Sequence, residues 1–110
     1  MSEEELRRTL AKLRADYAAQ LPDTVAQMAQ TWRRVLAAEL PPAALSELLR
    51  MAHSIGGSAT TFGLPAASEA ARALERLLEG CADSGRLPER GAQDRIAALL
   101  AALLRAAAPG

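Results

Sequence analysis

The chain has 110 residues, of which 50% are hydrophobic and 3% aromatic, and its 13 basic side chains balance its 13 acidic ones. This length predicts one domain over residues 1–110, and interspersed charge of zero net sign argues against nucleic-acid binding, which usually needs a basic face. The longest apolar run, near Ile96 to Leu104, is about half as long as a membrane-spanning helix requires.

Hydrophobic residues recur at helical spacing along the chain, and β-branched residues never cluster, which predicts an all-α protein. Ser2 to Glu5 fits a capping box that begins a first helix. Pro22 predicts a restart or a kink, and the second helix then runs to Pro41 and Pro42. The core stripes expected for these two helices are Leu6, Leu10, Leu13 and Tyr17, and then Leu21, Val25, Met28, Trp32 and Val35.

Glycine and proline also delimit the other three predicted helices. Gly63 ends the third, and Pro65 stands in the first turn of the fourth. A loop at Asp83–Gly85 precedes Pro88, which opens the last helix, and residues 106–110 are expected to form a frayed tail. The expected stripes are Leu45, Leu48, Ala52, Ile55, Ala59 and Phe62; Ala67, Ala70, Leu74, Leu77 and Cys81; and Ile96, Leu99, Leu100, Leu103 and Leu104.

Short connections between amphipathic helices favour antiparallel neighbours. The last four helices are the best patterned. We therefore predict an antiparallel four-helix bundle with an additional N-terminal helix packed on one end.

His53 is the only histidine, and two glycines, Gly56 and Gly57, follow it within the third helix. At about 100° per residue, His53 lies about 130° from the mean direction of the core stripe, so it should face largely outward. Arg50 and Gly57 fall roughly opposite the core, and Gly56 flanks His53 one turn on. Two interior glycines cost a helix about 2 kcal/mol, which predicts that bare backbone is needed in an open notch beside the imidazole.

Simpler interpretations of this segment remain open. A lone surface histidine is often just solvated, and paired glycines can serve close helix packing. A metal site is not expected, because one histidine and one cysteine without clustered carboxylates make no ligand set. Ser54 lies about 100° round the helix from His53, which makes a nucleophile–base pair of a hydrolase a poor fit.

The residues around His53 resemble the signature of histidine-containing phosphotransfer (HPt) domains. In that pattern an apolar residue stands two positions after the histidine, a glycine four after it, then small residues, and a glycine ten after it. The stretch Ala73–Glu75 also resembles the helix that follows in the family. The matching residues are His53, Ile55, Gly57, Ser58, Ala59 and Gly63.

The resemblance implies a phosphoryl carrier of a two-component phosphorelay, with His53 as the phosphoacceptor, through Nε2. The implied partners are a receiver domain of a response regulator, a hybrid sensor histidine kinase, or both. The domain would be a carrier and not an enzyme, with no cofactor, and the chain has no nucleotide-binding motif. Family members often have a lysine three residues after the histidine, where this chain has Gly56. Either Arg50 or the partner would then supply the positive charge.

Counting along a helical hairpin places Glu75 level with His53. Both are eleven residues from Leu64, at the centre of the turn, so Glu75 should accept a hydrogen bond from Nδ1 and leave Nε2 unprotonated. The alternative is a solvated Glu75 paired with Arg72 or Arg76. A partner should dock on the exposed face of the third helix, made of Ser46, Leu49, Arg50, His53, Gly56, Gly57 and Thr60.

Two other functions stay open: a helical adaptor or inhibitor of HPt ancestry that binds a receiver or kinase without relaying phosphate, and a structural bundle with an incidental histidine. A monomer is expected. Cys81 is the only cysteine, and the acidic start of the chain lacks a basic-then-apolar signal segment, so a cytoplasmic protein is expected.

Overall fold

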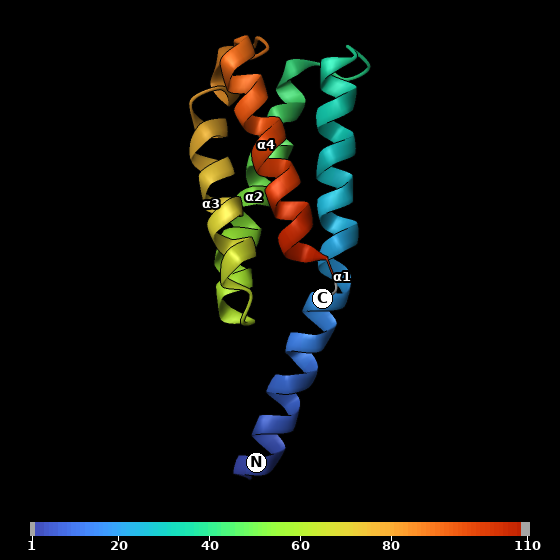
Figure 1. Cartoon of the computed structure of the whole chain (residues 1–110), viewed down its shortest axis with the longest axis vertical. Coiled ribbons are helices and arrows are strands. Elements are labelled where there is room, and N and C mark those ends of the chain that lie inside the picture. Colours follow the sequence, from blue (N-terminus) through green and yellow to red (C-terminus); the bar gives the residue numbers. More distant parts are fainter. Residues whose placement is uncertain (1, 109–110) are drawn as a thin grey trace.

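A computed structural model describes residues 2–108 and consists there of helices joined by short connections. The four α-helices are α1 (Glu3–Leu36), α2 (Leu45–Thr61), α3 (Pro65–Glu79) and α4 (Arg90–Ala107), with short 3₁₀ turns η1 (Pro42–Ala44) and η2 (Ala82–Ser84). The predicted all-α class is confirmed. Each helix contacts the next one in the chain, and α4 also contacts α1, so the four lie side by side around one core (Figure 1).

The first helix differs from the prediction, because α1 runs unbroken through Pro22. Proline removes one backbone donor from a helix, and the buried Leu21 and Val25, on either side of Pro22, anchor this stretch of α1 to the core. The prediction of a separate N-terminal helix is therefore wrong: that segment is the first part of α1. It projects past the end of the other helices at an angle to the rest of α1 (Figure 1).

The first predicted core stripe is wrong for the same reason. Leu6, Leu10 and Leu13 are 49%, 42% and 46% exposed, because no other helix reaches the projecting part of α1. Tyr17 is the first residue of the stripe to be partly covered, and its ring stacks on Phe62 with centroids 4.8 Å apart.

The remaining stripes are confirmed in part: Leu104, predicted for the core of α4, is 38% exposed. All five predicted core residues between Leu21 and Val35 are buried, as are five of the six predicted for α2. In α3 the buried face is turned slightly from the predicted one, because this helix packs against both α2 and α4. Its buried hydrophobic residues are Ala67, Ala71, Leu74 and Leu78.

The connection between α2 and α3 fixes how these two helices face each other. Gly63 has φ +82°, a left-handed conformation that glycine adopts without a steric penalty. The amide of Leu64 donates to the carbonyl of Ala59 at 2.7 Å, and Pro65 begins α3 at once. This tight reversal makes α2 and α3 antiparallel, and their mutual contact is the most extensive in the fold.

The C-terminal part of α4 is more ordered than expected. The helix continues to Ala107, whose methyl group is buried in the core, so the prediction of a frayed tail is wrong for residues 106 and 107. Residues 109 and 110 lie outside the described residues. Within residues 2–108, no helix has the length and apolar character to cross a membrane.

Candidate functional site

His53 stands in the middle of α2 and points into solvent. Its side chain is 75% exposed, while its neighbours Ala52 and Ile55 are buried. The outward orientation predicted from the helical periodicity is therefore present. Because the buried neighbours fix the rotation of α2, the imidazole is presented on a rigid element.

Glu75 of α3 contacts the Nδ1 edge of the imidazole. Its Oε2 lies 2.7 Å from Nδ1 of His53, and its side chain is only 20% exposed. A carboxylate only accepts hydrogen bonds, so Nδ1 carries the proton and donates, and the neutral ring has its free lone pair on Nε2. The predicted contact is present, and Glu75 bonds to His53 where the alternative had it paired with Arg72 or Arg76.

Gly57 forms an open place on the same exposed side of α2. A Cβ built on this residue would have no atom within 4 Å other than its immediate backbone surroundings. The backbone at Gly57 is thus open on the side where the notch was predicted. A docking protein or a phosphoryl group can approach the backbone there without meeting a side chain.

Gly56 does not belong to that notch, which corrects the prediction. It is buried against α3, and a Cβ on it would lie 3.0 Å from Cγ of Arg72. The carbonyl of Gly56 accepts a hydrogen bond from Oγ of Ser68 at 2.6 Å. The helical wheel placed Gly56 outward because it assumed a single core direction, whereas α3 covers a second side of α2. For Gly56 the interpretation as a residue for close helix packing is the right one.

Arg50 lies on the exposed face of α2, as predicted, but its charge already has a partner. Its guanidinium is exposed and forms an ion pair with Glu47, Nε lying 3.2 Å from Oε2. The hydrogen bond from Arg50 lowers the pKa of the Glu47 carboxyl. The charge of Arg50 is therefore already paired one turn before His53, because Glu47 shares its side of α2.

The remaining residues predicted for docking are only partly available. Ser46 is exposed and Leu49 is half-buried against the core. Thr60 donates its hydroxyl to Oγ of Ser68 at 2.6 Å, which turns it toward α3. The free part of the predicted face is thus centred on His53 and Gly57.

Two residues of α3 beside the site were not predicted. Ser68 is 2% exposed and joins α2 and α3 through its contacts with Gly56 and Thr60. Arg72 crosses Gly56 with its aliphatic stem. The signal for Ser68 was a lone hydroxyl at a core-facing position of an alanine-rich helix, and the signal for Arg72 was its spacing of one turn before Glu75.

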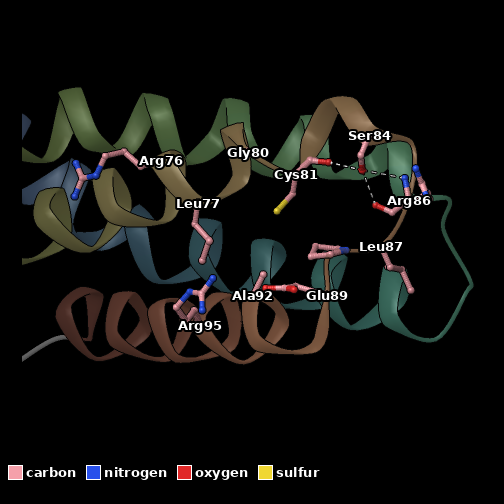
Figure 2. Close-up of a pocket in the computed structure, with 11 residues that line it drawn as sticks. Arg76, Leu77, Gly80, Cys81, Ser84, Arg86, Leu87, Glu89, Ala92 and Arg95 are labelled. Atoms are coloured by element: carbon pink, nitrogen blue, oxygen red, sulfur yellow. Dashed lines mark hydrogen bonds between the residues drawn. The ribbon is translucent and has the colours of Figure 1, made fainter.

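A separate surface pocket of about 540 Å³ lies between α3 and α4, near the η2 turn. Figure 2 shows Leu77 of α3, Cys81 between α3 and η2, and Arg95 of α4 around it. None of the residues predicted for the site lines this pocket. Among residues 2–108, no group of three histidine, cysteine or acidic side chains is arranged to hold a metal ion.

The family model described as "Hpt domain" matches residues 12–107, which is most of the chain and includes every site residue above. No curated protein and no solved structure matches the chain at a significant level.

Proposed function

Because the chain belongs to the Hpt domain family, whose members transfer phosphoryl groups in phosphorelays, we propose that His53 accepts and donates a phosphoryl group. The observation that carries the proposal is the bond between Nδ1 of His53 and Glu75, on an imidazole that is otherwise open to solvent. A surface histidine without a role does not need a partly buried carboxylate to set its tautomer.

The chemistry proposed is a reversible transfer between a receiver aspartate and His53. The Nε2 lone pair attacks the phosphorus of the aspartyl phosphate. A P–N bond forms as the P–O bond breaks, and the aspartate carboxylate leaves with the bonding electrons. Nδ1 keeps its proton, so the ring becomes cationic as the bond forms, and the carboxylate of Glu75 at 2.7 Å balances that charge. In the reverse direction an aspartate carboxylate attacks the phosphorus, the P–N bond breaks, and the ring leaves as the neutral imidazole with the electron pair on Nε2.

The domain itself needs to supply little beyond the nucleophile. Phosphoryl transfer depends mainly on positioning and on charge neutralisation. A rigid α2 provides positioning, and the open backbone at Gly57 lets a receiver bring its aspartate close to Nε2. The docking surface we propose is small and centred on His53 and Gly57, with Leu49 as an apolar contact, as is usual for transient signalling complexes.

The first test separates the nucleophile from the partner. Phosphoramidate is a small phosphoryl donor, so labelling with it requires no docking. We expect the wild-type protein to gain one acid-labile phosphoryl group, with a ³¹P resonance typical of an Nε2 phosphoimidazole. His53→Gln should keep its fold, since an exposed substitution changes stability by within about 0.5 kcal/mol, and should gain none. Acid-stable label, or equal labelling of His53→Gln, would refute the assignment.

The second test concerns Glu75. In Glu75→Gln the amide oxygen can still accept from Nδ1, but the charge that balances the cationic ring is gone. We expect slower labelling of Glu75→Gln and slower still of Glu75→Ala, with ¹⁵N shifts of His53 in Glu75→Ala showing a mixture of tautomers. Labelling rates and ¹⁵N shifts equal to those of the wild type in both variants would show that Glu75 has no role in the reaction of His53.

The third test addresses the adaptor alternative. A receiver domain charged with acetyl phosphate is mixed with the protein. Loss of label from the receiver, with transient label on His53, supports a carrier. Receiver binding that persists in His53→Gln, with no label passing to the wild type, would favour an adaptor that does not relay phosphate.

A further inference from the structure

The side chain of Arg72 lies across the bare backbone of α2 at Gly56. Its Cγ is 3.0 Å, and its Nε 3.8 Å, from the point that a Cβ on Gly56 would occupy. The stem of Arg72 therefore fills the place where a side chain of residue 56 would begin. Its guanidinium emerges at the level of Gly56, which is one helical turn after His53.

The register of the α2–α3 hairpin places the stem of Arg72 one helical turn from His53, the proposed phosphoacceptor. Arg72 precedes Glu75 by three residues, so the two share one face of α3. On that face Glu75 meets His53 and Arg72 meets Gly56, as two successive contacts between the helices. Three residues of α-helix span about 4.5 Å along the axis, a distance that an arginine side chain easily covers.

The charge of Arg72 is free within the described structure. Arg72 is exposed, and among residues 2–108 it takes part in no ion pair or side-chain hydrogen bond. Arg50, the other cation one turn from His53, is held by Glu47. Arg76 lines the pocket between α3 and α4 instead (Figure 2).

We propose that the guanidinium of Arg72 binds the phosphoryl oxygens carried by His53, supplying from α3 the cation that α2 lacks at position 56. The inference rests on the proposed function of His53 as phosphoacceptor. A guanidinium suits this role because its planar array of N–H donors matches two phosphate oxygens at once and stays charged at every physiological pH. The phosphoryl group, on Nε2, lies on the opposite side of the ring from the carboxylate of Glu75, so the two charges of α3 serve different ring atoms.

Gly56 is part of the same device. Any residue with a side chain there would require the stem of Arg72 to shift, because a distance of 3.0 Å to a Cβ is tighter than most real Cβ contacts. Gly56 lowers the helix propensity of α2, but it leaves the space in which the stem of Arg72 packs and from which its guanidinium extends.

The test compares Arg72→Ala with Arg76→Ala, the next arginine on α3, as the matched control. Both variants and the wild type are labelled with phosphoramidate, and loss of phosphohistidine is followed by ³¹P NMR after the donor is removed. We expect Arg72→Ala to be labelled at His53 but to lose the phosphoryl group about 3- to 10-fold faster than the wild type, as the loss of one exposed charge-assisted bond implies. Arg76→Ala should match the wild type.

Rescue separates charge from structure. In the Arg72→Ala background, Gly56→Lys has room for its side chain and should restore the slow loss, and Arg72→Lys should be intermediate. Equal lifetimes for Arg72→Ala and Arg76→Ala, or no rescue by Gly56→Lys in a folded protein, would overturn the role of Arg72 while leaving His53 as the acceptor. Absence of label from His53 in the wild type would overturn the proposed function, and this inference with it.

Discussion

Gly57→Ala should stabilise the protein while adding only one methyl group to the proposed docking surface. The new Cβ would have no neighbour within 4 Å, so neither packing nor strain changes. What remains is helix propensity, which favours alanine over glycine in a helix interior by about 1 kcal/mol. An unfolding entropy of about 2.1 cal/mol/K per residue then converts this gain into a rise in Tm of roughly 4 °C for a domain of this size.

The matched control is Gly56→Ala, one residue earlier in the same helix. Here the propensity gain is the same, but the new Cβ lies 3.0 Å from Cγ of Arg72, which must move. We expect a smaller rise in Tm than for Gly57→Ala, followed by circular dichroism on heating and by urea unfolding. A fall in Tm for Gly57→Ala, or a larger rise for Gly56→Ala, would refute the distinction between an open and a covered glycine.

A larger side chain at the same position separates docking from chemistry. Gly57→Leu should keep most of the stability gain, because leucine is also a good helix former and its Cβ would meet no atom within 4 Å. It should still be labelled by phosphoramidate but should accept phosphate slowly from a charged receiver domain, since the side chain fills the notch. Equal rates from the receiver for Gly57→Leu and the wild type would show that the notch has no part in docking.

Two further predictions concern the helices around the site. Ser68→Ala should lower the free energy of unfolding, measured in urea, by about 1–2 kcal/mol. The change removes the buried hydroxyl that forms hydrogen bonds with Gly56 and Thr60, both at 2.6 Å. An unchanged urea midpoint would argue against a stabilising role for these two bonds. Ala38→Gly should raise stability and Gly63→Ala should lower it, each by about 1 kcal/mol, because both positions have positive φ, 58° and 82°, which favours glycine; changes of the same sign in urea midpoint would contradict this reasoning.

The sequence predicted best where the physics is local. The outward direction of His53 could be predicted because the periodicity of α2 alone sets it. The contact with Glu75 could be predicted because it depends only on two continuous helices and a tight turn at Leu64. The predictions failed where a second neighbouring helix determines whether a residue is buried. Gly56 is covered by α3, which a helical wheel of α2 does not contain.

The errors in α1 have the same origin. Leu6 and Leu10 repeat at helical spacing as core residues do, but no other helix of the fold extends far enough to cover them. Local rules predict a helix boundary at Pro22, yet α1 continues through this residue, with the buried Leu21 and Val25 on either side of it. The position of Arg72 depends on the distance between two helix backbones, which no pattern within one helix records.

The amides of α1 should exchange hydrogen at different rates before and after Tyr17, the residue that stacks on Phe62. Before Tyr17 the helix has water on all sides, so its amides open by local fraying at little cost in free energy. From Leu21 onward one face of α1 is buried in the core, so we expect its amides to exchange mainly when the whole domain unfolds. One unbroken helix thus has an N-terminal part expected to exchange fast and a protected remainder. The boundary between them is Tyr17, and its partner Phe62 is the C-cap residue of α2, the helix that carries His53.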